Sequence, residues 1–278
     1  MASPIISPKE LAALEAAVLL DARSKTAFDA GHLRGALNVD PGVQLSAASS
    51  PGFDPATGGR HPLPSLSQWR TTLGLLGIGS GTPVVIYDDQ AGANAAARAW
   101  WMLKAIGHEA AQVLDGGLKA ALGAGLDLTS DPPTAEPCAH YPATAWLLPT
   151  VDLDVVEKLA KHPEWRVVDV RASERYQGIT EPLDPVAGHI PGAVNLAFSN
   201  NVDAEGRFKS PAELRALYTQ LLGGLRPDHL VVHCGSGITA CHTLLALEHA
   251  GLPGSALYAG SWSEWCRSGK PVATGVEP

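Results

Sequence analysis

The stretch VLLDARSKTAFDAGHLRGALNVD, from Val18 to Asp40, has a counterpart later in the chain, RVVDVRASERYQGITEPLDPVAGHIPGAVNL, from Arg166 to Leu196. Each begins with an apolar run followed by Asp-x-Arg and then reaches Gly-His-x-x-Gly-Ala. Each finishes on an Asn followed by an apolar residue. Several landmarks repeated in the same order are typical of a duplicated structural unit.

The segments downstream of these two stretches also match. PVVIYDDQAGANAAARAWWMLKAIGH, residues 83–108, parallels LVVHCGSGITACHTLLALEHAG, residues 230–251. In both, a short β-branched run meets a turn of small residues and then a helical pattern. Strands that alternate with helices indicate βαβ crossovers and a parallel sheet covered by helices. The sequence therefore predicts two α/β domains of similar fold, each a mainly parallel sheet flanked by helices.

The segment between the repeats is rich in Pro, Thr and Ala and has no hydrophobic periodicity: DLTSDPPTAEPCAHYPAT, residues 127–144. Such a composition is typical of a linker. We therefore expect an N-terminal domain over residues 1–126, a linker over 127–148 and a C-terminal domain over 149–278.

Composition limits the possible partners and compartments. The net charge is −8 without any cluster of Lys or Arg, which argues against nucleic acid or an anionic membrane as the main partner. The apolar runs are shorter than the ~20 residues that span a bilayer, and the first residues lack the pattern of a signal peptide. The cysteines are too few and too scattered for a disulfide framework, so we expect the cytoplasm. They are Cys138, Cys234, Cys241 and Cys266.

The two halves differ at one position that matters for chemistry. In the first half the strand VVIY is followed by Asp88, and in the second half LVVH is followed by Cys234. A thiolate is a soft nucleophile, whereas a carboxylate is not. The second half is therefore predicted to carry the reaction.

The residues after Cys234 favour a reactive thiol over an inert core cysteine. Gly235 and Gly237 permit backbone conformations that turn successive N–H groups inward, and a helix is predicted to begin after Thr239. These N–H groups and the positive end of the helix would stabilise a thiolate or a persulfide anion at the sulfur. Ser236 would add a hydroxyl donor.

Three other interpretations of this loop fit less well. Residues 235–240 match G-x-G-x-x-A, but the next strand, SALYAG, lacks the acidic residue of a dinucleotide site. A phosphatase loop needs an arginine six residues after the cysteine, where this chain has Ala240. The His and Cys residues at 233, 234, 241 and 242 do not have the spacing of a zinc site. We therefore expect neither a cofactor nor a metal.

Taken together, these motifs resemble the tandem-domain rhodanese family. The resemblance rests on Asp-x-Arg, Gly-His-Ile-Pro-Gly-Ala and the loop CGSGITA of residues 234–240, and it extends to FDPATGGRHPLPS and YAGSWSEW. The loop is similar to that of 3-mercaptopyruvate sulfurtransferases, with Ile238 in place of the more usual Val. Thiosulfate-specific members tend to have Arg and Lys where this chain has Gly235 and Ser236.

The resemblance implies ping-pong sulfur transfer. Cys234 would take a sulfur atom from 3-mercaptopyruvate or thiosulfate as a persulfide and pass it to cyanide, a small thiol or thioredoxin, with Ser236 assisting catalysis. Substrate binding would involve Arg175, which suits an anionic group, and the loop residues Gly235, Gly237, Ile238 and Thr239.

One departure from the family pattern leaves the donor open. Mercaptopyruvate enzymes usually have a second arginine shortly after the Glu-Pro pair, and this chain has Leu183 after Glu181 and Pro182. Mercaptopyruvate is favoured, but a thiosulfate-specific enzyme remains an alternative. So does a persulfide carrier that delivers sulfur to a protein partner.

The remaining repeated residues are expected to be structural. His32 and His189, in the two Gly-His turns, are predicted to hydrogen-bond the backbone. The two Asp-x-Arg pairs are predicted to form internal ion pairs.

Overall fold

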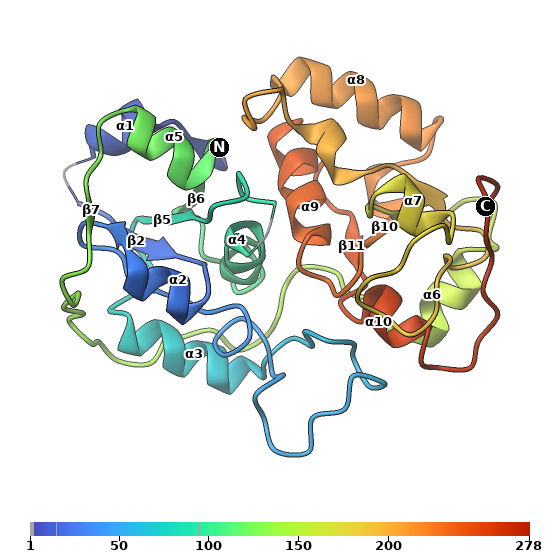
Figure 1. The fold of residues 1–278 in the computed structure, drawn as a ribbon, viewed down its shortest axis with the longest axis horizontal. Helices are drawn as coiled ribbons and strands as arrows, with labels where there is room; N and C mark the ends of the chain where they lie inside the picture. The colour runs from blue at the N-terminus through green and yellow to red at the C-terminus, as the bar shows by residue number, and fades with distance from the viewer. Residues whose placement is uncertain (1–2, 15, 94) are drawn as a thin grey trace. The chain divides into compact units, whose positions relative to one another are not determined.

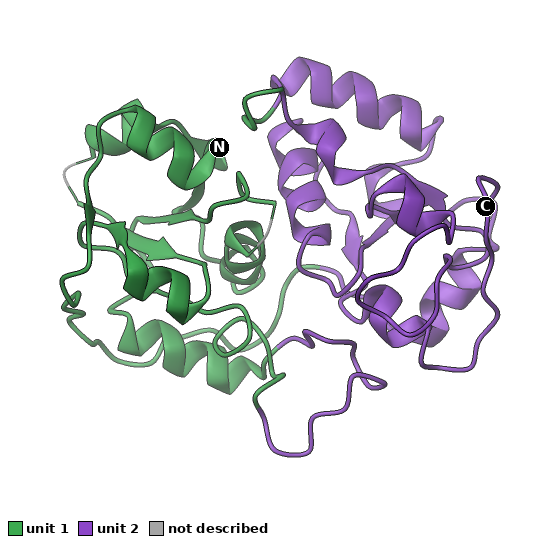
Figure 2. Cartoon of the chain, in the orientation of Figure 1, with its two compact units in different colours: residues 1–49, 64–148, 204–208 green, residues 50–63, 149–203, 209–278 purple. Residues whose placement is uncertain are grey.

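The computed structural model describes residues 3–14, 16–93 and 95–278, and the chain forms two compact units. Unit 1 comprises residues 1–49, 64–148 and 204–208, and unit 2 comprises 50–63, 149–203 and 209–278 (Figure 2). This division differs from the sequence-based boundaries at three places. Residues 127–148 join unit 1, residues 50–63 join unit 2, and residues 204–208 join unit 1.

The main sheet of unit 1 has five strands, and every pairing in it is parallel. Their order is β1 (Ile5–Ile6), β6 (Ala111–Leu114), β5 (Val84–Tyr87), β2 (Val18–Asp21), β4 (Leu37–Asn38). A separate antiparallel pair joins β3 (His32–Leu33) and β7 (Leu128–Thr129). The helices of this unit are α1 (Pro8–Ala12), α2 (Lys25–Ala30), α3 (Leu66–Leu75), α4 (Ala96–Lys104) and α5 (Gly117–Gly123) (Figure 1).

Unit 2 contains a four-stranded sheet whose pairings are also all parallel. Its order is β11 (Ala256–Leu257), β10 (Leu230–His233), β8 (Arg166–Asp169), β9 (Val194–Asn195). The α-helices are α6 (Leu153–Leu159), α7 (Ser173–Tyr176), α8 (Pro211–Leu222), α9 (Ala240–His249) and α10 (Ser261–Trp265), with 3₁₀ turns η1 (Phe198–Asn201) and η2 (Pro227–His229). Two α/β units with parallel sheets and flanking helices confirm the predicted fold class.

Local sequence explains where these elements begin and end. The longest helix of unit 2, α8, has a capping box between Ser210 and Glu213 and a proline at its start. It ends at Gly223, whose φ of 59° is the left-handed conformation that favours glycine. The strand β10 is apolar along Leu230–Val232 and buried on both faces, as expected of a central parallel strand.

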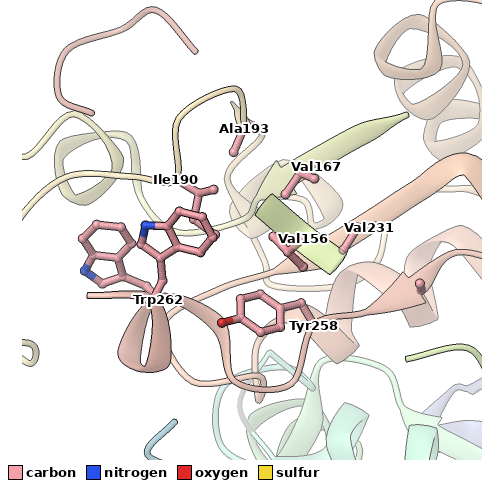
Figure 3. Packing of buried hydrophobic residues seen from close by; sticks show 9 residues of the cluster. Val156, Val167, Ile190, Ala193, Val231, Tyr258 and Trp262 are labelled. Atoms are coloured by element: carbon pink, nitrogen blue, oxygen red, sulfur yellow. The ribbon is translucent and has the colours of Figure 1, made fainter. Parts of the chain in front are cut away.

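The core of unit 2 lies between its sheet and helices α6 and α10. Figure 3 shows aliphatic side chains packed against aromatic rings. Both tryptophans of α10, Trp262 and Trp265, are at most 2% exposed. The buried members of the cluster are Val156, Val167, Ile190, Ala193, Val231, Ala256, Tyr258, Trp262 and Trp265. Burying these side chains supplies much of the driving force for folding of this unit.

The structural contacts predicted for the repeated motifs are confirmed in both units. Arg23 pairs with Asp21 at 2.6 Å, and Arg171 pairs with Asp169 at 2.5 Å. Each arginine also donates to a glycine carbonyl just before the motif histidine, Gly31 at 2.6 Å or Gly188 at 2.7 Å. The motif histidines bond backbone carbonyls in turn: Nδ1 of His32 lies 3.0 Å from the Phe28 oxygen, and Nδ1 of His189 lies 2.8 Å from the Tyr176 oxygen. These contacts tie the end of a central strand to the following loop.

Among the described residues, no helix combines the length and the apolar character needed to cross a membrane.

Candidate active site

Cys234 directly follows β10, at the carboxyl edge of the sheet of unit 2. The parallel register pairs His233 with Asp169, so β8 and β10 end side by side. The side chain of Cys234 is buried, with 2% of the residue exposed. Its N–H donates to the hydroxyl of Ser261 at 3.1 Å, and its carbonyl accepts from the N–H of Trp262 at 3.0 Å. The segment at the start of α10 therefore holds the backbone on both sides of the sulfur.

The two loop glycines have different environments. Gly237 has a φ of +77°, and a Cβ atom placed there would lie 2.3 Å from the carbonyl oxygen of Ala259. Gly235 has no such strain, but a Cβ atom there would lie 3.4 Å from Nη1 of Arg175 and 3.4 Å from Nη2 of Arg60. Gly237 therefore fixes the loop backbone, and Gly235 lies directly beside two guanidinium groups.

Ser236 contacts a residue from the segment 50–63. Its Oγ lies 2.9 Å from Nδ1 of His61, and the serine is 7% exposed. Two hydrogen bonds join this segment to α10. The N–H of Gly58 donates to the Glu264 carboxylate at 2.8 Å, and the N–H of Arg60 donates to the Ser263 hydroxyl at 3.0 Å. A serine hydroxyl beside an imidazole is an arrangement that can pass a proton.

Arg175 lies on α7 and is oriented by acidic residues. Its Nη2 contacts Glu181 at 2.6 Å and lies 3.7 Å from the buried carboxylate of Asp184. Arg60 also pairs with Asp184, and Arg267 contacts the other oxygen of that carboxylate at 2.8 Å. Ion pairs with carboxylates thus fix the orientation of the Arg60 and Arg175 guanidinium groups near Gly235.

The remaining predicted residues complete the loop. Ile238 is 5% exposed and lies in the turn, and Thr239 is the residue before the first residue of α9, as predicted. The Thr239 side chain makes no capping hydrogen bond to α9. The structure thus brings Cys234, Gly235, Ser236, Gly237 and Arg175 together, with Ile238 and Thr239 leading into the helix.

The corresponding loop of unit 1 indicates what such a loop can hold. Asp88 follows β5 as Cys234 follows β10, and it is fully buried. Its carboxylate accepts from the N–H groups of Gln90 at 2.9 Å, Gly92 at 2.8 Å and Ala96 at 3.0 Å. Burial raises the pKa of Asp88, and these amide donors oppose that rise. In unit 1, the strand-to-helix loop thus directs three backbone N–H groups at the residue that corresponds to Cys234 in unit 2.

Electrostatics beneath the loop are set by buried side chains of β8 and β10. Burial alone would raise the pKa of Asp169, but the Arg171 guanidinium, which pairs with it and donates hydrogen bonds to it, outweighs burial and lowers that pKa below its usual value. Burial lowers the pKa of His233, which favours the neutral imidazole. Asp169 and Arg171 thus form a charged pair under a neutral histidine.

Several residues of this site were not predicted from the sequence. Arg60 and His61 lie in FDPATGGRHPLPS, which resembled the family, yet no local pattern assigns that segment to the second unit. Asp184 and Arg267 are separated by more than eighty positions and meet only in the folded chain. The signal that was available is a basic Arg-His pair flanked by glycines and prolines.

The neighbouring cysteines differ in environment from Cys234. Cys241 is fully buried on α9, and its Sγ lies 3.4 Å from the carbonyl oxygen of Gly237. Cys266 is half-buried, and burial raises the pKa of its thiol. None of the four cysteines, all of which lie within the described ranges, forms a disulfide, and no group of three or more His, Cys, Asp or Glu side chains there is arranged to hold a metal ion.

Comparison with known proteins identifies the family of this chain. The model of the rhodanese-like domain matches the chain twice, at residues 7–124 and 152–268. The chain belongs to the rhodanese-like family. The two matches correspond to the two repeats recognised in the sequence, and the second includes the loop after β10.

Curated members of the rhodanese-like family are similar over most of this chain. A Pseudomonas aeruginosa protein named "Probable 3-mercaptopyruvate sulfurtransferase" is 42% identical over 89% of this chain and 86% of its own length. The human 3-mercaptopyruvate sulfurtransferase is 38% identical over 90% of this chain and 82% of its own length. A rat thiosulfate sulfurtransferase is 41% identical over 75% of this chain and 71% of its own length. This rhodanese-like chain is a sulfurtransferase.

The fold agrees with a solved structure of the family. The 3-mercaptopyruvate sulfurtransferase from Leishmania major superposes with a TM-score of 0.84 at 28% identity. The match covers 98% of this chain and 76% of that protein.

Proposed function

We propose that this sulfurtransferase moves a sulfur atom from 3-mercaptopyruvate to a thiol or cyanide through a persulfide on Cys234. The observation that carries the proposal is the position of Cys234, beside the Ser236–His61 pair and next to a glycine under two guanidinium groups. Relatives at 38% and 42% identity that carry the name of a 3-mercaptopyruvate sulfurtransferase support this donor.

The first half-reaction breaks the carbon–sulfur bond of the donor. The Cys234 thiolate attacks the donor sulfur, a sulfur–sulfur bond forms, and the electron pair of the broken bond passes to the adjacent ketone as an enolate. Ser236 donates a hydrogen bond to that oxygen, and His61 beside it supports the hydroxyl. Protonation of the enolate carbon gives pyruvate. Arg175 binds the carboxylate of the donor.

The second half-reaction returns the enzyme to its starting state. A thiolate or cyanide attacks the outer sulfur of the persulfide, the sulfur–sulfur bond breaks, and the Cys234 thiolate leaves. The backbone of Gly235–Thr239 would hold the persulfide anion as the loop of unit 1 holds the Asp88 carboxylate. Thioredoxin or a small thiol is the proposed acceptor.

We place the catalytic domain at residues 149–278 together with residues 50–63, because that segment supplies His61 to the site. We place the reaction in the cytoplasm, where cysteines that form no disulfide stay reduced.

Replacement of the nucleophile tests the proposal directly. Cys234→Ser should abolish sulfur transfer from every donor while leaving the melting temperature close to that of the wild type, because the substitution changes one atom. Mass spectrometry of the wild type after incubation with 3-mercaptopyruvate should show one added sulfur on the peptide that contains Cys234. Cys266→Ser is the matched control and should remain active. Turnover by Cys234→Ser, or sulfur added to another cysteine, would contradict the proposal.

Thiosulfate is the second donor to be tested. The ratio of kcat/KM for 3-mercaptopyruvate to that for thiosulfate, with cyanide as acceptor, measures the preference. We expect the ratio to exceed one because Gly235 and Ser236 offer no side-chain charge to a dianion. A ratio below one would assign the chain to the thiosulfate type. Transfer only to a protein acceptor would identify a persulfide carrier.

A further inference from the structure

The residues that follow Glu181, from Pro182 to Gly188, include no cationic side chain that could bind a donor carboxylate. Leu183 is 59% exposed and has no charge. The turn is organised by Glu181, whose carboxylate accepts from the N–H groups of Leu183 at 3.0 Å and Asp184 at 3.2 Å. This turn leaves Leu183 in solvent and buries Asp184, whose side chain is 0% exposed.

Arg60, in the segment 50–63, lies beside Arg175 and next to Gly235. We propose that Arg60 is the second carboxylate-binding arginine of the site, and that Arg60 and Arg175 together select a sulfur donor that carries a carboxylate. This inference rests on the proposed function. Both guanidinium groups lie within 3.4 Å of the point that a Cβ atom of Gly235 would occupy. A ligand above Gly235 would meet both of them next to the Cys234 sulfur.

Packing and a hydrogen bond fix the backbone around Arg60. The Arg60 side chain is therefore already positioned before a ligand binds. A Cβ atom on Gly59 would lie 2.2 Å from the carbonyl oxygen of Gly260, so the chain there packs closely against the start of α10. The N–H of Arg60 donates to Ser263. The Arg60 side chain is 22% exposed and that of Arg175 is 19% exposed, so each keeps a solvent-accessible face for a ligand.

The charge balance of this cluster favours an added anion. Asp184 pairs with Arg60 and Arg267, and Glu181 pairs with Arg171 and Arg175. Asp169 pairs with Arg171. In the ion pairs between these described side chains, four guanidinium groups share three carboxylates, so one positive charge is not balanced. A donor carboxylate would balance it, and two planar guanidinium groups can each offer paired N–H donors to its oxygens.

The neighbour of Arg60 strengthens the assignment. His61 contacts the Ser236 hydroxyl, which the proposed mechanism directs at the donor ketone. In an α-keto acid the ketone and the carboxylate are adjacent carbons. Arg60 would thus bind the donor carboxylate, and His61 would act through Ser236 on the adjacent ketone. Both residues lie in the segment 50–63.

The test compares two donors that differ only in the carboxylate. Mercaptoacetone has the thiol and the ketone of 3-mercaptopyruvate, with a methyl group in place of the carboxylate. Arg60→Met should lower kcat/KM for 3-mercaptopyruvate about 100-fold, mainly through KM, and should change kcat/KM for mercaptoacetone less than about threefold. Arg60→Lys keeps the positive charge but lacks the paired N–H donors of the guanidinium group. Its kcat/KM for 3-mercaptopyruvate should be about tenfold higher than that of Arg60→Met.

Arg267→Met is the matched control, because it removes the other guanidinium group that pairs with Asp184. It should affect the two donors by the same factor. Equal effects of Arg60→Met on both donors, or no effect, would overturn the proposal. If Arg60→Met does not fold, the test uses Arg60→Lys. The quantity compared with the wild type is then the ratio of kcat/KM for 3-mercaptopyruvate to kcat/KM for mercaptoacetone, and an unchanged ratio overturns the proposal.

A separate measurement distinguishes this proposal from the proposed function. Enzyme loaded with sulfur from inorganic polysulfide should transfer it to cyanide at the same rate in the wild type and in Arg60→Met, since no carboxylate is involved. Equal rates together with the loss of 3-mercaptopyruvate turnover support the role of Arg60. Failure of wild-type Cys234 to accept sulfur from either source would instead refute the proposed function.

Discussion

Gly237 shows how a single residue fixes the geometry of the reactive loop. Its positive φ and its approach to the Ala259 carbonyl leave no room for a side chain. Gly235, two residues earlier, has no strained backbone, and a methyl group there would meet only the ends of two arginine side chains. Gly237 is therefore required by the backbone, whereas Gly235 is a position for which we propose a role in binding the ligand.

Alanine substitutions at these two positions should have different consequences. Gly237→Ala should lower the free energy of unfolding by about 2–4 kcal/mol, since it adds a left-handed alanine and a clash with a carbonyl. Gly235→Ala should lower it by less than about 1 kcal/mol but raise KM for the donor. Urea denaturation and steady-state kinetics of both variants measure these effects. Similar losses of stability in both would contradict this account.

At the scale of elements, much of unit 2 could be predicted because its signals are local. The β-branched run before Cys234, the small residues of the turn and the helical pattern after Thr239 predict the strand, the loop and α9 where the structure has them. The Asp-x-Arg motif predicts the Asp169–Arg171 ion pair because the two residues are only two positions apart.

What could not be predicted depends on contacts between distant parts of the chain. Nothing in the composition of residues 50–63 shows that they pack on the start of α10, about 200 positions later. The hydrogen bond from Arg60 to Ser263 and the contact of His61 with Ser236 join residues that are far apart in the chain and meet only in the folded unit 2. For the same reason, nothing local in the sequence indicates that Arg60 lies beside Arg175, above Gly235.

The N-terminus of helix α4 is capped by Asp88 and not by its own N-cap residue. Its N-cap residue, Ala95, makes no side-chain hydrogen bond, and the Ala96 N–H instead donates to the Asp88 carboxylate eight residues earlier. Asp88 thus acts as a distant cap for the helix and an acceptor for two loop N–H groups. The Asp88 carboxylate in unit 1 thus has a structural role at the position where we propose a chemical role for Cys234 in unit 2.

Removal of this carboxylate should destabilise unit 1. Asp88→Ala leaves three backbone N–H groups without that acceptor, and we expect a loss of about 2–4 kcal/mol in the free energy of unfolding. Asp89→Ala, at the adjacent exposed position, is the control and should change it by less than about 0.5 kcal/mol. Thermal and chemical denaturation test this difference. Equal stability of the two variants would show that Asp88 does not support the helix.

At the scale of the whole molecule, buried histidines make stability depend on pH. Burial lowers the pKa of the buried His108, His233 and His242 and of the half-buried His249, which are distributed over both units. A histidine with a lowered pKa in the folded state is protonated first in the unfolded state, at about its ordinary value of 6.5. The folded chain therefore loses stability as the pH falls below about 6.5.

His242 should account for a measurable part of this loss. Burial lowers its pKa to about 3, and its Nδ1 lies 3.2 Å from the amide nitrogen of Asn201, which donates to it. At about pH 4.5 the unfolded chain would have bound this proton and the folded chain would not, a difference on the order of 3 kcal/mol. His242→Gln keeps an acceptor for Asn201 but cannot bind the proton. Whatever its stability at pH 7, its free energy of unfolding should fall less steeply between pH 6.5 and 4.5 than that of the wild type. Parallel curves for the two proteins in urea titrations would mean that His242 is protonated equally in the folded and unfolded states, and that the acid sensitivity arises at other groups.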